Sequence, residues 1–100
     1  MEWITFIKKE NVRKAEDAIK SDIELASRQS LTVRDANALG IEGEGSFFLI
    51  SGTDEGVEKC KELIKEYVEE VGEEKLEKAK EKIKEEEDKA AEGMGGIFNI

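Results

Sequence analysis

The alternation of apolar and polar positions along the chain predicts strands and helices in turn. Residues 3–7 are rich in aromatic and β-branched side chains, and residues 46–51 form a nearly continuous apolar run, so both segments are predicted to be strands. Between them, apolar residues recur at spacings of three and four over 12–26, which is typical of one face of a helix. The run at 46–51 indicates a strand that is buried on both faces, or on one face near the centre of a sheet.

Residues 31–41 permit two interpretations. Their apolar residues alternate with polar or small ones, as in a strand, whereas Ser30 is also suited to cap a short helix that ends at Gly40. We favour the strand, because residues 42–45 contain two glycines and are typical of a hairpin turn.

The clearest helix is predicted over residues 54–71. Thr53 or Asp54 is suited to cap its first turn, and Glu55 suits the positive end of the helix dipole. Gly72 occupies a position at which helices commonly stop. The apolar stripe of this helix consists of Val57, Cys60, Leu63, Ile64, Tyr67, Val68 and Val71.

From residue 73 onward, lysine and glutamate dominate the chain. An exposed helix is predicted here, and the three glycines at 93–96 are expected to end it. The apolar end at 97–100 is suited to form one more strand. The apolar stripe of this helix is thin and consists of Leu76, Ala79, Ile83 and Ala90.

Together these elements predict an α+β fold. Their order is β-α-β-β-α, followed by the additional helix and the short apolar end, and it matches a ferredoxin-like two-layer sandwich with an acidic C-terminal helix. We expect two parts, a compact α+β domain over 1–72 and a Glu/Lys-rich helix with an apolar end over 73–100.

Charge and composition exclude several classes of function. The chain has 25 acidic and 16 basic residues and a formal net charge of −9, which excludes a nucleic-acid binder that relies on phosphate neutralisation and disfavours anionic membranes. We expect neither a membrane-spanning segment nor a secretory leader, and the single cysteine favours a cytoplasmic location. Charged residues make up 41% of the chain, and the lysine and glutamate content favours a thermophilic origin.

The residue types also limit the chemistry that the chain supports. It has no histidine and one cysteine, which removes the usual general base, the Ser-His and Cys-His nucleophile systems, and a structural zinc site. Cys60 lies on the apolar stripe of a predicted helix and is expected to be a buried core residue. We therefore predict that the chain is not an enzyme.

A bound metal ion would have to be held by oxygen, which indicates Ca²⁺ or Mg²⁺. No EF-hand loop is present in the sequence, so a site would be assembled from separate loops. The alternative interpretation is that these acidic residues are solvated or cap helices. The candidate ligands are the loop carboxylates Glu42, Glu44, Asp54 and Glu55.

The expected topology decides which loops meet. We expect the strands at 3–7 and 46–51 to run parallel, which places residues 10–11 beside Asp54 at one edge of the sheet. The hairpin tip with Glu42 and Glu44 then lies at the opposite edge, near the end of the first helix at residues 22–24.

The end of the chain indicates a second class of function. Acidic residues at 85–88 are followed by glycines at 93–96 and then by Ile97 and Phe98. This succession resembles the C-terminal tails of archaeal ribosomal stalk proteins, which are acidic and helical, end in glycine and bulky apolar residues, and bind translation factors. The resemblance implies a partner-binding site made of Met94, Ile97, Phe98 and Ile100. The alternative is that these residues pack into the fold.

We thus predict a small, non-catalytic, acidic binding domain that binds Ca²⁺ or Mg²⁺ through loop carboxylates. The alternative is a protein-interaction module that uses the C-terminal helix and the apolar end. A third interpretation is a weak homodimer rather than a monomer, because Leu76, Ile83 and Ala90 are spaced by seven residues, as in a coiled coil.

Overall fold

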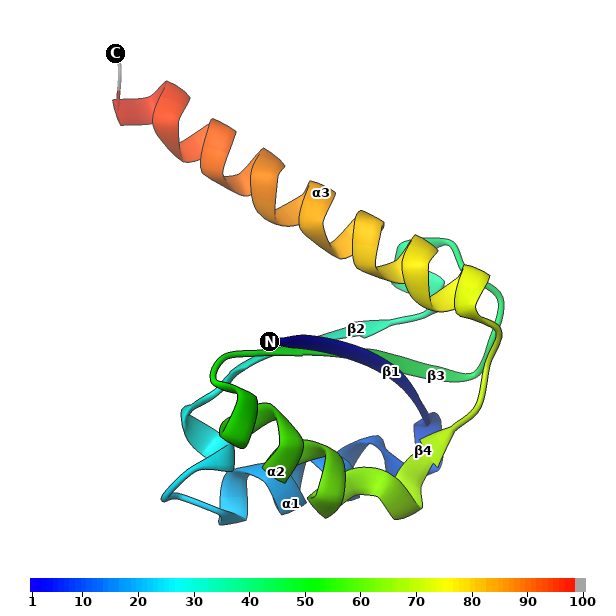
Figure 1. Cartoon of the computed structure of the whole chain (residues 1–100). Helices are drawn as coiled ribbons and strands as arrows, with labels where there is room; N and C mark the ends of the chain where they lie inside the picture. Colours follow the sequence, from blue (N-terminus) through cyan, green and yellow to red (C-terminus); the bar gives the residue numbers. More distant parts are fainter. Residues whose placement is uncertain (99–100) are drawn as a thin grey trace.

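The chain folds into a four-stranded antiparallel sheet with helices on both faces (Figure 1). The computed structural model describes the backbone of residues 1–98 and the side chains of residues 1–86. The predicted α+β class is confirmed. The strands are β1 (Glu2–Lys8), β2 (Ser30–Asp35), β3 (Gly45–Ser51) and β4 (Val68–Glu69), and the helices are α1 (Val12–Ser21), α2 (Asp54–Ile64) and α3 (Glu73–Phe98).

The strands lie in the order β2-β3-β1-β4, and each neighbouring pair is antiparallel. The prediction that the first strand runs parallel to the strand at 46–51 is wrong, because Glu2 lies opposite Ser51 and Lys8 lies opposite Gly45. The reason is that α1 carries the chain from β1 to β2, which runs in the same direction as β1. The β2–β3 hairpin then reverses the chain, and β3 enters the sheet between them.

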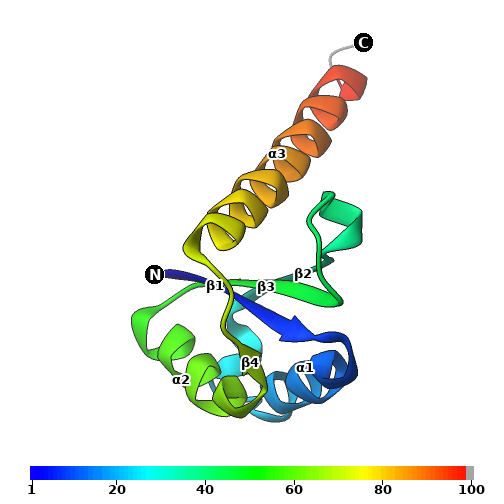
Figure 2. The same cartoon turned by 90° about the vertical axis from the view of Figure 1, so that its right-hand side faces the viewer.

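The first face of the sheet is covered by α1 and α2, which lie side by side beneath it in Figures 1 and 2. Burial of an apolar stripe drives each helix onto the sheet, as the spacing of three and four predicts. Of the two predicted caps, Thr53 is the one that caps α2, because its side chain accepts a hydrogen bond of 3.1 Å from the Gly56 N–H. The buried residues of this core are Ile7, Ala15, Ile19, Ala26, Phe48, Ile50, Val57, Cys60 and Ile64.

The second face of the sheet is covered by α3, which adds a third layer to the predicted two (Figure 2). Ala79 and Ile83 are fully buried there, and Leu76 packs at the margin of the same core. Phe47 contributes from β3, and its ring centroid lies 5.0 Å from that of Phe6. Strand β3 is therefore buried on both faces, which is one of the two arrangements that its apolar run indicates.

Ion pairs connect α3 to the strands at the margin of this core. The Nζ atoms of Lys80 and Lys84 lie 2.9 Å and 3.0 Å from Oε1 of Glu2, and Arg34 Nε lies 3.1 Å from Oε2 of Glu86. The contacts with Lys80 and then Lys84 lower the pKa of Glu2 below its ordinary value of 4.5. Each pair is partly exposed, so its contribution to stability is small.

These contacts predict a pH dependence. Because the pKa of Glu2 is lower in the folded chain than in the unfolded one, ionised Glu2 stabilises the fold above about pH 4.5, and this contribution is lost as the pH falls through the folded value. We expect Glu2→Gln to lower the free energy of unfolding by about 0.5 kcal/mol at neutral pH, and the difference from wild type to shrink toward about pH 3. Urea unfolding at several pH values measures it. Asp17→Asn, on the exposed face of α1, controls for net charge, and an equal effect of both variants at every pH would contradict the prediction.

The segment after α2 departs from the predicted helix. α2 ends at Ile64, and a short 3-10 turn (Lys65–Tyr67) leads into β4, which pairs with Phe6 and Ile7 of β1. The predicted stop at Gly72 is therefore wrong. β4 supplies backbone partners for Phe6 and Ile7, at the end of β1 that is buried.

The end of the chain also departs from the prediction. β4 takes the place of the fourth strand, for which residues 97–100 are suited by sequence, and Ile97 and Phe98 instead continue α3. The expected break at 93–96 is wrong, because α3 passes through these glycines. Residues 99–100 lie outside the described part of the chain. No helix in the part that the structure describes is long and apolar enough to cross a membrane.

The ambiguous segment is a strand in its first part only, and the favoured prediction of a strand is wrong for residues 36–41. Residues 30–35 form β2, as favoured, and a 3-10 turn (Asn37–Leu39) follows, ending at Gly40. Gly40 has a φ of 70°, in the left-handed region that glycine adopts without strain.

Candidate functional site

The four predicted metal ligands lie at two opposite ends of the sheet. Glu42 and Glu44 belong to the connection between β2 and β3, whereas Asp54 and Glu55 open α2 just after β3. The seven residues of β3 separate these positions by about 20 Å. They therefore form two separate groups, as the sequence also implies.

The neighbours expected for each group are exchanged, because the predicted strand direction is wrong. The Lys9 N–H donates to the Glu44 carbonyl oxygen at 3.2 Å, which places residues 10–11 beside Glu44 rather than beside Asp54. The loop after α1 lies beside the start of α2, where Gln29 Oε1 accepts from the Thr53 N–H at 3.0 Å.

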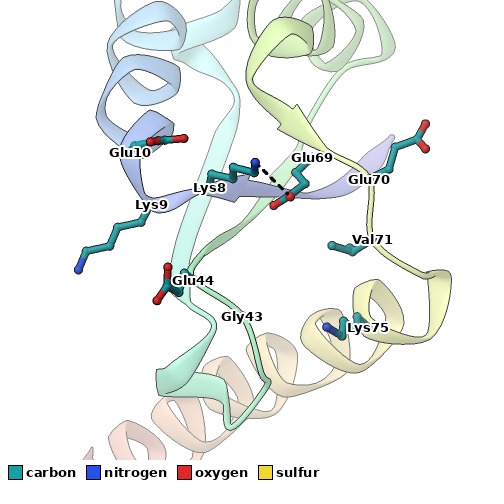
Figure 3. A pocket seen from close by; sticks show the side chains of 9 residues that line it. All are labelled: Lys8, Lys9, Glu10, Gly43, Glu44, Glu69, Glu70, Val71 and Lys75. Carbon is teal, nitrogen blue, oxygen red and sulfur yellow. Dashed lines mark ion pairs between the residues drawn. The ribbon is translucent and has the colours of Figure 1, made fainter.

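The Glu44 end of the sheet carries an open pocket of about 920 Å³ (Figure 3). It forms where the end of β1, the β2–β3 connection, β4 and the first turn of α3 converge. Its lining residues are Lys8, Lys9, Glu10, Gly43, Glu44, Glu69, Glu70, Val71 and Lys75.

Charges of both signs are mixed in this pocket. Lys8 Nζ lies 3.5 Å from Glu69 Oε1, the ion pair drawn in Figure 3, and Lys75 Nζ donates to the Glu42 carbonyl oxygen at 3.3 Å. A hard cation is held by several converging oxygen ligands, and ammonium groups beside those oxygens oppose it. Among residues 1–86, no group of three or more acidic, cysteine or histidine side chains is placed to hold a metal ion. Binding of Ca²⁺ or Mg²⁺ stays a prediction.

Asp54 and Glu55 lie at the start of α2, at the other end of the sheet. Both lie in the first turn of α2, where carboxylates interact favourably with the helix dipole. Asp54 Oδ1 lies 3.7 Å from the amino group of Met1, and the Asp54 side chain is 87% exposed. This arrangement agrees with the alternative interpretation given above, in which the acidic residues are solvated or stabilise the start of a helix.

The one thiol is not placed for chemistry. Cys60 is fully buried, as predicted, and its Sγ lies 3.6 Å from the Ala26 carbonyl oxygen. Burial, with a smaller contribution from the charge of Asp22, raises the pKa of the Cys60 thiol. The thiol is therefore protonated at neutral pH and is a poor nucleophile.

Comparison with protein-family models, curated proteins and solved structures finds no match to this chain. A functional proposal therefore rests on the geometry of the chain itself.

Sequence reasoning did not predict that Lys8, Lys9 and Lys75 line this pocket, nor that β4 forms one of its sides. Residues 68–71 are assigned to a helix in the sequence because Ile64, Tyr67, Val68 and Val71 have helical spacing. No signal in the segment itself separates that helix from a short edge strand. For the predicted partner site, Met94, Ile97 and Phe98 lie within α3, but their side chains and all of Ile100 fall outside the described residues.

Proposed function

We propose that the chain is a non-catalytic binding module in which the distal half of α3 is an arm that docks into a protein partner. The observation that carries the proposal is the course of α3, whose first turns pack on the sheet and whose later turns leave it. Among residues 73–86, whose side chains the structure describes, Leu76, Ala79 and Ile83 pack against the sheet. In Figures 1 and 2 the later turns, drawn orange to red, rise away from the sheet. A helix of 26 residues is about 39 Å long, and the sheet supports only part of that length.

The globular part is best described as a ferredoxin-like support for this arm. β1 and β2 run in the same direction with β3 between them, and α1 connects them, which is the arrangement of a split β-α-β unit. β4 on the far side of β1 would complete the motif.

The sequence of the arm indicates the chemistry of its partner. Residues 85–92 contain five acidic side chains and one lysine, and Met94, Ile97 and Phe98 follow. An apolar groove with a basic rim fits a helix of this kind. Bulky apolar residues at the end of a strongly charged segment also favour a binding role for it.

The proposal is tested with photo-crosslinking. Benzoylphenylalanine replaces Ala91 on the arm, or Lys14 on the exposed face of α1 as a matched control, in the full chain expressed in its source cells. We expect one protein to be crosslinked from position 91 and not from position 14, and to be lost when Phe98→Asp is added. Titration of that purified protein is then expected to show saturable binding that weakens at least tenfold between about 50 mM and about 500 mM NaCl.

A thermal melt of the chain without residues 93–100 completes the test. If this segment is a free arm, the melting temperature stays within about 2 °C of wild type. A loss of several degrees would show that the segment packs into the fold, and equal crosslinking from positions 14 and 91 would contradict a specific arm.

A further inference from the structure

The hydrogen-bonding pattern of the sheet identifies which backbone groups of β2 point away from β3. The Ala36 N–H donates to the Gly45 carbonyl oxygen at 3.0 Å, in register with the β2–β3 ladder. Because bonded and non-bonded pairs alternate in an antiparallel ladder, Thr32 and Arg34 bond to β3. The N–H and C=O groups that point away from β3 belong to Leu31, Val33 and Asp35.

The hydrogen bonds between β3 and β1 lead to the same assignment of bonded residues. The Gly52 N–H donates to the Met1 carbonyl oxygen at 3.0 Å, and the Lys9 N–H donates to the Glu44 carbonyl oxygen at 3.2 Å. Even-numbered residues of β3 therefore bond to β1, which leaves its odd-numbered residues for β2. The bonds on both sides of β3 therefore agree that Thr32 and Arg34 are the residues of β2 that bond to β3.

The free edge of β2 is regular and accessible. β2 is the last strand of the sheet on its side, and its pairing with β3 runs without interruption from Ser30 opposite Ser51 to Asp35 opposite Ser46. It contains no proline and no lysine, two residues that proteins place on edges to prevent pairing. Such an edge is a template for another strand.

We propose that β2 pairs antiparallel with β2 of a second copy of this chain, around a two-fold axis at Val33. In this register, Val33 lies opposite Val33 of the other copy, and Leu31 lies opposite its Asp35. The outward-pointing N–H and C=O groups of all three residues then have partners across the axis in both copies. The two sheets join into one of eight strands.

Self-complementarity favours a second copy as the occupant. The two-fold register places Asp35 opposite Leu31 and Arg34 opposite Thr32, so no two like charges lie directly across from one another. Leu31 and Val33 are half-buried and pack against the core between the sheet and helices α1 and α2. Pairing therefore extends that apolar core across the axis, in the self-matching contact that a two-fold dimer requires.

Two features keep this dimer weak. Arg34 Nη1 donates to the Val33 carbonyl oxygen at 2.9 Å, while its Nε contacts Glu86 of α3. The carbonyl oxygen has a second lone pair for the incoming N–H, but the guanidinium group crowds the edge. The net charge of −9 on each copy also opposes association, so added salt strengthens the dimer.

The test combines mass and amide hydrogen exchange on the full chain. Sedimentation equilibrium from about 10 µM to about 1 mM, in low and high salt, is expected to show a monomer that becomes a dimer at high concentration, more readily in high salt. Over the same range, the amides of Leu31, Val33 and Asp35 are expected to exchange at least about tenfold more slowly as dimers form. Those of Thr32 and Arg34 are protected at every concentration.

Variants locate the interface. Val33→Pro removes the central outward N–H but no bond to β3, and is expected to give a monomer at about 1 mM. Ile23→Ser is the control, because Ile23 is 74% exposed and lies outside β2, and it is expected to dimerise like wild type. A monomer at the highest concentration and salt would overturn the proposal, as would a dimer in which these three amides stay unprotected. The exchange measurement uses the unmodified chain, so the result holds even if Val33→Pro fails to fold.

Discussion

Replacing Gly45 with alanine is expected to lower the free energy of unfolding by about 2–3 kcal/mol. A Cβ at this position would overlap the carbonyl oxygen of Ile7 and lie 2.7 Å from Cζ of Phe6. Neither neighbour has room to move, because Ile7 is fully buried in β1 and Phe6 packs against Phe47. Urea unfolding followed by circular dichroism measures the loss.

Gly72→Ala is the matched control for this prediction. No atom lies within 4 Å of a Cβ built at Gly72, which precedes α3. This variant is expected to stay within about 0.5 kcal/mol of wild type. Equal stability of the two alanine variants would mean that β1 and β3 are not as close at Gly45 as the structure has them.

Truncating Ile83 to alanine is expected to cost about 2–4 kcal/mol. Ile83 is fully buried where α3 meets the sheet, so the change removes apolar contacts and leaves a cavity. Glu77→Ala, on the exposed side of the same helix, is the control and is expected to change stability by less than about 0.5 kcal/mol. If Ile83→Ala were as stable as wild type, the thin apolar stripe would not anchor the helix to the sheet.

Local patterns predict the elements that local physics determines. The β-branched and aromatic residues of β1, the helical spacing in α1 and the apolar run of β3 each identify their element. The cap at Thr53 follows from its position before α2. The apolar run of β3 indicates a central strand, but it leaves open whether one face or both are buried.

Long-range features are the ones that sequence reasoning gets wrong. The direction of β1 relative to β3 depends on which strand α1 connects to, and no local residue encodes that choice. The packing of α3 on the second face could not be predicted from its thin apolar stripe. Two or three apolar residues are enough to bury this helix, because the sheet already presents Phe47 and Leu49 on that face.

The neighbours of the candidate site residues also depend on long-range pairing, and sequence reasoning placed them wrongly. Glu42 and Glu44 lie in a loop, whereas Asp54 and Glu55 belong to the first turn of α2. Reversing one strand also exchanges the segments that meet at each end of the sheet. Glu44 therefore lies beside Lys9 and the lysines of the pocket instead of beside the end of α1. The proposed pairing surface on β2 was not visible either, since free backbone groups follow from strand order and not from side-chain types.

The placement of β1 in the middle of the sheet has a kinetic consequence. The β2–β3 hairpin is local, but β1 joins β3 through pairs as distant along the chain as Glu2 and Ser51, and it joins β4 through Phe6 and Glu69. Closing these long loops costs chain entropy before any contact offsets it. Folding is therefore expected to take milliseconds or longer rather than microseconds, with the hairpin forming first and the insertion of β1 limiting the rate.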